Sequence, residues 1–366
     1  MKKAYIVYRN YYDFKKNKIT IGGIQTYITD LTKVCLEIGL EPVVLQPGEE
    51  ELTHKENGVI INQYKIDERN RTKKYKKELT KRINHNELVI FATDNLIPDK
   101  SPFMNSIVIQ HGISWDIPME SGRGQLREFI SKCKNAYVMI NRLQYVNKIV
   151  CVDYNFINWY RTQVDKVNGQ LVAIPNYSKL APVYHKPDDT LNIIFARRLF
   201  EYRGTRVFTK AIKILLEEYK NINVTVAGSG PDENWMKTEL SRYKCVKFIQ
   251  YESEDSLKIH EDKHIAVVPT VGSEGTSLSL LEAMSAQCTV IASDVGGMTN
   301  IILDGYNGLL VSAGDEQSLL TALRRVIECP NLRTELSHRA YETVESSFSH
   351  EKWREKWVAV LKSVMR

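Results

Sequence analysis

The sequence predicts an α/β protein made of two Rossmann-like β/α/β domains, each built on a parallel sheet. Short apolar segments alternate with segments of helical periodicity along the chain. The alternation stops at a polar, proline-bearing stretch and then starts again. A length of 366 residues is enough for two domains that each bury a core. We therefore expect two domains that face each other across a cleft.

The N-terminal half shows the alternation first. Apolar runs predict strands at residues 5–8, 42–45, 59–63, 87–92, 106–110, 137–140 and 148–152, and a short last element at 173–176. Residues 23–38 have the apolar spacing of a helix. Strands that alternate with helices favour a parallel sheet covered on both faces. The first domain is expected at residues 1–176, followed by a linker at 177–190.

The C-terminal half repeats the pattern over residues 191–349. Strands are expected at 191–196, 224–227, 246–249, 265–268, 290–292 and 309–311. Helices are expected at 204–219, 256–260, 278–286, 317–328 and 332–346. Residues 350–366 carry Trp353 and Trp357 at helical spacing, which predicts a last helix.

The composition is that of a soluble globular protein, with 43% hydrophobic and 26% charged residues. No apolar run approaches the roughly 20 residues that span a bilayer, and the apolar part of the N-terminus is too short for a signal peptide. The six cysteines are scattered without a Cys-x-x-Cys pair, as expected in a reducing compartment. These features predict a cytoplasmic protein.

The net charge of +6 is concentrated in one segment, residues 65–82. This segment carries nine Lys or Arg and three Asp or Glu, so that 9 − 3 = +6 and the remaining chain is formally neutral. A basic face can hold a protein on the inner, anionic face of the plasma membrane. A solvated helix face is the alternative. No nucleic-acid-binding motif accompanies the segment, so we expect no nucleic-acid partner.

The most informative motif is a pair of glutamates eight positions apart, Glu274 and Glu282. Glu274 lies in the loop after the expected strand 265–268, and Glu282 about two turns into the expected helix. Ligands of open α/β sheets bind at this edge, and amides at a helix start favour an anion such as a diphosphate. Phosphate repels carboxylates, which are better suited to the hydroxyls of a sugar or ribose. The pattern indicates a nucleotide-sugar site, with donor contacts at Gly275, Thr276, Ser277 and Leu278.

Two arginines follow the strand 191–196 and favour the same ligand. Arg198 and Arg203 can share one loop at the carboxyl end of that strand. Guanidinium groups bind diphosphate oxygens in charge-assisted, often bidentate geometry. The alternative is a basic surface loop.

Weaker signals come from the first domain. Gly22 and Gly23 open the helix 23–38, where the backbone can approach a ligand closely, although turns use the same residues. His111 ends the strand 106–110 and can donate to a sugar hydroxyl; a structural histidine is the alternative. By position alone, Trp115 and Asp116 are candidate acceptor contacts.

The second domain has one further glycine loop and no sign of a metal. Gly228 follows the strand 224–227, and with Tyr251 it can frame a nucleobase, although a turn alone explains the glycine. No Asp-x-Asp motif exists to hold a divalent ion beneath a diphosphate, so we expect no metal and no other cofactor. His260 and His264 are four positions apart, but a strand starts at the second, which argues against zinc.

Together these residues resemble the retaining glycosyltransferases of family 4, which have the GT-B fold. The family's Gly-Arg-Leu and Lys-Gly elements correspond to residues 197–199 and 203–204, and its Glu-x₇-Glu motif to Glu274 and Glu282. Further blocks resemble residues 174–176, 291–297 and 304–311. The likeness covers nearly the whole chain and is specific only in the second half. Arg203 stands for the usual Lys, and residues 276–277 replace a common Phe-Gly pair.

The resemblance implies roles for individual residues. Arg198 and Arg203 would bind the donor diphosphate, Glu274 the transferred sugar and Glu282 the ribose. Gly23 and His111 would approach the donor from the first domain. The last helix, 350–366, would pack back on that domain.

The resemblance also implies a reaction. It would be transfer of a hexose-type sugar, with retention and without metal, from a UDP-sugar or, alternatively, a GDP-sugar. The acceptor would be a glycan or a lipid-linked sugar in bacterial cell-surface polysaccharide synthesis, such as lipopolysaccharide or capsule. The alternatives are a nucleotide-sugar epimerase, a noncatalytic glycan- or partner-binding subunit, and a nicotinamide-dependent oxidoreductase. The absence of Gly-x-Gly-x-x-Gly after a strand argues against the last.

Overall fold

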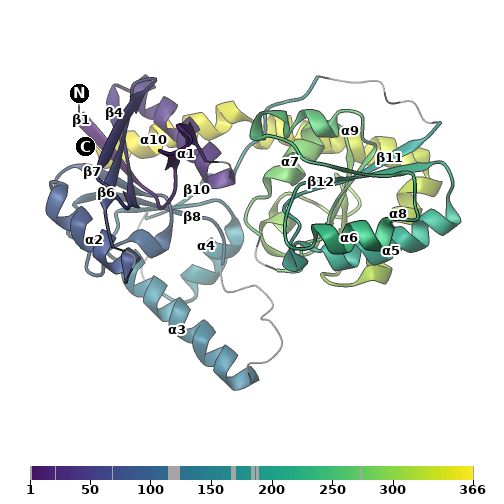
Figure 1. The fold of residues 1–366 in the computed structure, drawn as a ribbon, viewed down its shortest axis with the longest axis horizontal. Helices are drawn as coiled ribbons and strands as arrows, with labels where there is room; N and C mark the ends of the chain where they lie inside the picture. The colour runs from purple at the N-terminus through teal and green to yellow at the C-terminus, as the bar shows by residue number, and fades with distance from the viewer. Residues whose placement is uncertain are drawn as a thin grey trace. The chain divides into compact units, whose positions relative to one another are not determined.

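The structure of this chain is a computed structural model that describes residues 2–20, 22–67, 69–113, 124–165, 170–182, 186, 189–272 and 274–365. The described residues form two compact units (Figure 1). The first contains those up to residue 111, those between 124 and 174, and those from 354 onward. The second contains Gly112, Ile113 and those between 175 and 353. The predicted class, with two parallel-sheet α/β units, is confirmed.

The first unit is built on an eight-stranded sheet in the order β10-β9-β8-β7-β1-β4-β6-β5. All neighbouring strands are parallel except β5 and β6. The strands are β1 (Lys2–Val7), β4 (Leu40–Gly48), β5 (Leu52–Glu56), β6 (Val59–Lys65), β7 (Leu88–Phe91), β8 (Asn105–Gln110), β9 (Lys148–Cys151) and β10 (Leu171–Ala173). Strand β7 is buried at every residue, because helices and loops cover both faces of the sheet.

In the described part of this unit, four helices, a small hairpin and the residues from 354 onward accompany the sheet. The helices are α1 (Gly23–Glu37), α2 (Arg71–Arg82), α3 (Gln125–Leu143) and α4 (Tyr154–Arg161), with a single 3-10 turn, η1 (Asp94–Leu96). The hairpin strands are β2 (Tyr12–Asp13) and β3 (Lys18–Ile19). Helix α4 begins where the side chain of Asp153 accepts a hydrogen bond from the amide of Phe156, a regular N-cap.

The second unit is built on a six-stranded parallel sheet in the order β13-β12-β11-β14-β15-β16. The strands are β11 (Leu191–Ala196), β12 (Ile222–Ala227), β13 (Val246–Ile249), β14 (Ile265–Val268), β15 (Thr289–Ser293) and β16 (Leu309–Val311). The helices are α5 (Thr205–Glu218), α6 (Glu233–Leu240), α7 (Leu278–Ser285), α8 (Glu316–Glu328) and α9 (Pro330–Ser347). Shorter 3-10 segments are η2 (Glu201–Arg203), η3 (Ser253–Asp255), η4 (Lys258–His260) and η5 (Gly296–Asn300).

Strand β11 shows how this sheet separates two apolar cores. Ile193 and Phe195 pack with the apolar side chains of α5, α6 and α8 on one face. Ile194 and Ala196 pack with those of α7 and the end of α9 on the other (Figure 1). Because alternate residues of a strand point to opposite faces, one apolar run serves both cores. This arrangement fixes which way the side chains after Ala196 point.

The last helix, α10 (His350–Val364), carries two buried tryptophans one turn apart. Trp353 packs against Tyr177, with ring centroids 5.0 Å apart, in the second unit. Trp357 packs edge-on against Tyr27 of α1 in the first unit, and its indole Nε1 donates a hydrogen bond of 2.8 Å to the Tyr27 hydroxyl. The residues from 354 onward group with the first unit.

Replacing Tyr27 by phenylalanine is expected to lower the free energy of unfolding by about 0.5–1.5 kcal/mol, because the buried bond from Trp357 is lost while the ring stays. Urea unfolding measures the difference. Tyr145→Phe, a change at a more exposed ring of the same unit, is the control and should be neutral. Equal effects of the two changes would show that the bond contributes nothing.

Two expected elements are wrong. Residues 137–140 were expected as a strand but lie within helix α3, where only Met139 and Leu143 of the described side chains are buried, at helical spacing. The run of Tyr, Val, Met and Ile has a high strand propensity, but it belongs to a helix that is exposed to solvent on most of its surface. Residues 256–260 form no α-helix: they follow η3, and only Lys258–His260 are helical, as the 3-10 turn η4. Among the described residues, no helix is long and apolar enough to span a membrane.

Candidate functional site

The strongest candidate site lies at the carboxyl ends of β11 and β14, where two arginines converge on Glu274. Arg197 Nη2 donates to Glu274 Oε2 at 2.6 Å, and Arg203 Nη1 donates to the same oxygen. The Thr270 hydroxyl donates to it at 3.1 Å. All three hydrogen bonds end on Oε2. Among the described residues, none of these donors bonds Oε1. Glu274 is therefore fixed by one oxygen and presents the other.

The charges of this cluster do not cancel. Two guanidinium groups and one carboxylate sum to 2 − 1 = +1. Burial opposes ionisation of Glu274, but the charges of Arg197 and Arg203 outweigh burial and hold the pKa of its carboxyl below the usual value. Nε and Nη1 of Arg197 are buried and have no hydrogen-bond partner among the residues that the structure describes. The cluster thus keeps positive potential beyond what Glu274 neutralises, which favours an anionic ligand.

Sequence reasoning singled out Arg198, but the structure brings Arg197 to Glu274. Arg197 is buried, whereas Arg198 is exposed, with its guanidinium 5.7 Å from the Phe200 ring centroid. The strand alternation after Ala196 sends the two arginines to opposite sides. The doubled arginine at a strand end was the available signal, but a sequence does not tell which of the two turns inward. Arg203, at the end of η2, also contacts Glu274.

The loop that carries Glu274 leads into α7, whose start was a predicted anion-binding point. Thr276 and Ser277 are buried, and Ser277 is the N-cap of α7 without a capping side-chain bond. First-turn amides left without a side-chain acceptor can bind a ligand instead. The side-chain amide Nδ2 of Asn176 donates to the Thr276 carbonyl oxygen at 2.6 Å, a contact that sequence reasoning missed. Gly275, at the bend, and Leu278, the first helical residue, lie where they were expected.

Glycines let the backbone of this loop pack closely. The Gly297 amide donates to the Glu274 carbonyl at 2.8 Å, and a Cβ on Gly296 would lie 2.0 Å from that carbonyl oxygen. Gly228, with φ of 130°, lies against Arg197 in the same way, because a Cβ there would be 2.3 Å from the Arg197 carbonyl oxygen. Gly228 thus shapes the backbone under the arginine cluster, a position compatible with the expected donor contact.

Glu282 lies on α7 and is held by a residue that sequence reasoning missed. The Ser256 hydroxyl donates to Glu282 Oε1 at 2.7 Å. Burial raises the pKa of Glu282 to about 7. Tyr251 is close enough for its pKa to rise to about 12, through burial and through the charge of Glu282. Tyr251, Ser256 and Glu282 therefore form a second polar group in the same unit, able to exchange hydrogen bonds with hydroxyls.

The candidates of the first unit lie at its own sheet edge. His111 follows β8, its Nε2 lies 3.0 Å from the Ala92 carbonyl oxygen, and its ring packs edge-on against Tyr27. Burial lowers the pKa of His111 to about 4, so the ring is neutral at pH 7. Gly22 and Gly23 begin helix α1, as expected. Trp115 and Asp116 lie outside the described residues.

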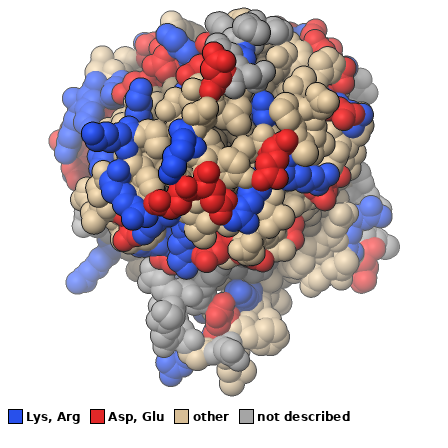
Figure 2. All heavy atoms as spheres, turned by 90° about the vertical axis from the view of Figure 1, so that its right-hand side faces the viewer, with Lys and Arg blue, Asp and Glu red and all other residues tan. Residues whose placement is uncertain are grey.

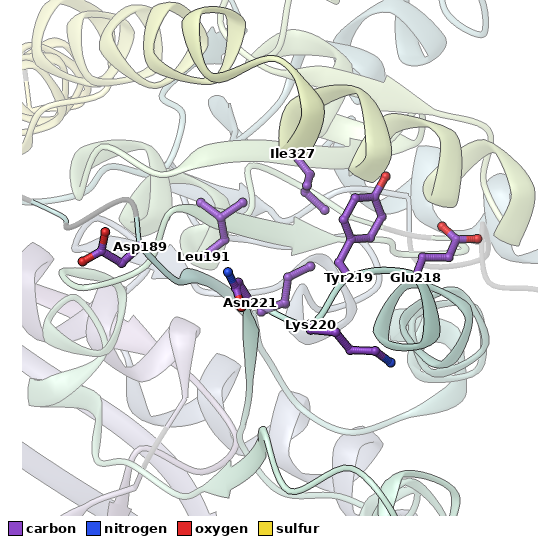
Figure 3. A pocket seen from close by; sticks show the side chains of 8 residues that line it. Asp189, Leu191, Glu218, Tyr219, Lys220, Asn221 and Ile327 are labelled. Carbon is purple, nitrogen blue, oxygen red and sulfur yellow. The ribbon is translucent and has the colours of Figure 1, made fainter.

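Two other regions of the second unit do not carry the site. A cavity of about 360 Å³ is lined by Leu191, Ile222 and Tyr219 among others (Figure 3). Leu191 and Ile222 are the first residues of β11 and β12, so this cavity lies at the amino ends of the strands, the edge opposite the arginine cluster.

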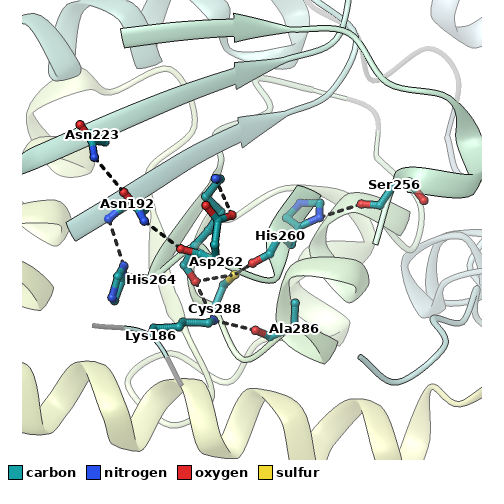
Figure 4. Close-up of polar contacts among 10 residues, drawn as sticks. Lys186, Asn192, Asn223, Ser256, His260, Asp262, His264, Ala286 and Cys288 are labelled. Carbon is teal, nitrogen blue, oxygen red and sulfur yellow. Dashed lines mark hydrogen bonds and ion pairs between the residues drawn. The ribbon is translucent and has the colours of Figure 1, made fainter. Parts of the chain in front are cut away.

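The second region is the polar network around Lys186 (Figure 4). Lys186 Nζ donates to three carbonyls, those of Lys263, Ala286 and Gln287. His260 Nδ1 bonds the Ser256 carbonyl oxygen at 2.9 Å, and Cys288 Sγ donates to the His260 carbonyl. These side chains bind backbone, which identifies the network as structural. In the described part of the chain, no three His, Cys, Asp or Glu are grouped as metal ligands would be.

Comparison with known proteins identifies related sequences. The family model for "Glycosyl transferases group 1" matches residues 177–343. The capsular polysaccharide biosynthesis glycosyltransferase CapM of Staphylococcus aureus is 25% identical over 228 residues, a match that covers 60% of this chain and 57% of CapM. The chain spans about half the length of the curated relatives that it matches.

Solved structures share the whole fold at low identity. A variant of S. aureus TarM in complex with fondaparinux, α-GlcNAc-glycerol and UDP aligns with a TM-score of 0.75 at 12% identity, covering 99% of this chain and 100% of TarM. Anabaena HepE in complex with UDP-glucose aligns with a TM-score of 0.74 at 13% identity, covering 99% and 100% of the two chains. These likenesses concern the fold.

Proposed function

We propose that this chain is a retaining glycosyltransferase, because residues 177–343 match the family model for glycosyl transferases group 1 and the fold is similar to that of solved GT-B glycosyltransferases. It moves a hexose-type sugar from a nucleotide-diphosphate sugar to a glycan or lipid-linked acceptor in bacterial cell-surface polysaccharide synthesis. The resemblance to CapM supports the pathway class. HepE, with UDP-glucose, and TarM, with UDP, favour a UDP-sugar over a GDP-sugar.

One observation carries the proposal: Glu274 is fixed through Oε2 by two arginines and a threonine, at the start of a helix. The donor diphosphate lies at the positive end of α7 and near Arg203, with Arg198 reaching it from the exposed side of the loop. Glu274 Oε1 accepts hydrogen bonds from hydroxyls of the transferred sugar. Glu282, with Tyr251 beside it, accepts hydrogen bonds from the ribose.

The chemistry follows from the charges. Departure of the nucleoside diphosphate develops negative charge, which the arginines and the α7 amides stabilise because they are already in place. The preorganised cations replace a metal ion in this role. Glu274 is bound to two guanidinium groups and is a poor nucleophile, so attack occurs on the face that the leaving group vacates. The departing phosphate takes the acceptor proton, and the anomeric configuration is retained. His111, neutral at pH 7, hydrogen-bonds the donor sugar.

The first test is calorimetric titration of the protein with UDP and with GDP in EDTA at pH 8, where Glu282 is ionised. Wild-type protein is expected to bind one of the two without metal. Glu282→Ala should weaken that binding by about 10- to 100-fold, because a hydrogen bond to a charged group contributes about 1.5–3 kcal/mol.

Glu345→Ala provides the matched control, since Glu345 is an exposed glutamate on α9. Its affinity should equal that of the wild type. Binding that appears only after a divalent ion is added would contradict metal independence. A Glu282→Ala variant with unchanged affinity would contradict the ribose assignment.

The basic segment 65–82 is the proposed membrane contact of this protein. This segment contains the last residue of strand β6 and the whole of helix α2. The exposed side chains Lys73 and Lys77 of α2 have no ion-pair partner among the described residues. Elsewhere the charges are mixed: on the face drawn in Figure 2, basic and acidic side chains are interspersed. The segment contacts the anionic cytoplasmic surface of the plasma membrane, where lipid-linked acceptors are present, and the protein is cytoplasmic and peripheral.

A further inference from the structure

Helix α3 presents an apolar stripe to solvent, the largest group of exposed apolar side chains among the described residues of the first unit. Leu126 is 71% exposed, Phe129 64%, Ile130 56% and Tyr137 68%. Cys133, on the same side, is exposed too. Scattered exposed apolar residues are ordinary on a protein surface, but a contiguous group of this size marks an interaction site.

The stripe is separate from the core of the unit. At 3.6 residues per turn, residues 126, 129, 130, 133 and 137 fall within an arc of roughly 100°. Met139 and Leu143, which are buried, lie outside this arc and nearer the C-terminal end of the helix. Figure 1 shows α3 running from its packed C-terminal end to an N-terminal end that projects beyond the sheet of the first unit. None of the described side chains from 126 to 138 is buried.

The charges around the stripe are basic. Helix α3 carries four basic residues and one acidic residue, so its formal charge is 4 − 1 = +3. Arg127 and Lys134 flank the stripe along one edge and make no ion pair with any described residue. Helix α2 lies beside the packed end of α3, since Lys76 and Arg142 interact electrostatically. The basic surface of α2 and the apolar stripe of α3 thus belong to neighbouring elements.

We propose that α3 is an interfacial helix that inserts its apolar stripe into the headgroup region of an anionic membrane. An amphipathic helix with an apolar face and basic flanks lies in the plane of such an interface. Arg127 and Lys134 contact lipid phosphates, while Leu126, Phe129 and Ile130 enter the acyl boundary. Charge disfavours the alternative occupant, a second copy of α3, because two helices of charge +3 repel each other. This docking is independent of the transfer reaction and adds an apolar anchor to the electrostatic contact of residues 65–82.

The test compares vesicle binding of the full chain and of a triple variant, L126S/F129S/I130S. The probes are vesicles of phosphatidylcholine alone and of phosphatidylcholine with phosphatidylglycerol, and co-sedimentation measures the bound fraction. We expect wild-type protein to bind the anionic vesicles, and the triple variant to bind them at least tenfold more weakly. A second variant, R127E/K134E, should lose binding to a similar extent. Salt should weaken wild-type binding without abolishing it, because the apolar contact is not screened.

The matched control replaces three exposed apolar residues that lie elsewhere, M104S/I214S/L303S, and should bind vesicles as the wild type does. Thermal unfolding and UDP or GDP titration of each variant show that the fold and donor site persist, which separates this result from a failure of the proposed transferase function. Three outcomes overturn the proposal: wild type that binds no vesicles, a triple variant that binds as wild type does, and a concentration-dependent dimer that the triple variant abolishes while vesicle binding stays unchanged.

Discussion

Replacing Glu274 by alanine is expected to lower the free energy of unfolding by about 3–5 kcal/mol, because Arg197 is left buried without its ion-pair partner. Arg203 also loses its partner but is less enclosed. Urea unfolding followed by circular dichroism measures the loss. The same variant should lose sugar transfer by about 10²–10³-fold, the usual effect of removing one preorganised polar contact from a transition state.

A double-mutant cycle separates these two effects. The double variant Glu274→Ala/Arg197→Met also removes the buried guanidinium that has lost its partner. It should recover most of the stability, since a buried apolar side chain requires no counter-charge. It should recover none of the transfer activity, because the oxygen that meets the sugar is still absent. Recovery of activity in the double variant would mean that Glu274 serves only to neutralise Arg197.

The second large effect concerns pH and Glu282. Its pKa is about 7 in the folded protein and near 4.5 as an ordinary glutamate. Between these pH values the folded state binds more protons than the unfolded chain, so stability falls as pH rises through this window and levels off above it. The gap of 7 − 4.5 = 2.5 units corresponds to at most about 3 kcal/mol. Glu282→Gln removes the ionisation and should therefore become more stable, relative to wild type, as pH rises from 5 to 8.

The measurement is urea unfolding of wild type and Glu282→Gln at pH 5, 6, 7 and 8, with Glu345→Gln as the control. Other titrating groups contribute equally to both proteins, so the difference between them reports Glu282. That difference should grow with pH for Glu282→Gln and stay flat for the exposed control. A flat difference in both would show that the Glu282 carboxyl is as well solvated in the folded protein as in the unfolded chain.

The fold was predictable from the sequence because its signals are local and repeated. Strands such as β11 and β14 are unbroken apolar runs, which buried parallel strands require. The error at residues 137–140 arose where that logic fails: these four apolar residues are consecutive, as in a buried strand, but they lie on a helix that packs by only part of one face. The hairpin β2–β3 is too short to leave a periodic signal.

The candidate site was predictable in its position and only partly in its contacts. The loop–helix motif placed Glu274 and Glu282 correctly on their elements, because a strand end and a helix start are local features. The partners of these glutamates come from elsewhere in the sequence: Arg197 is 77 residues from Glu274, and Ser256 is 26 residues from Glu282. Such pairings depend on which strands become neighbours, and no local pattern encodes them.

The glycine contacts beneath Glu274 and Arg197 bear on how this protein can evolve. Main chain packs on main chain there, so the loop keeps its path whatever side chains it displays. A side chain at Gly228, Gly296 or Gly297 would meet main chain at close range, so these three positions are not free to drift. Mutations that alter the side chains of this loop therefore act on a backbone path that the glycines hold in place, and descendants of this sequence are expected to inherit that path.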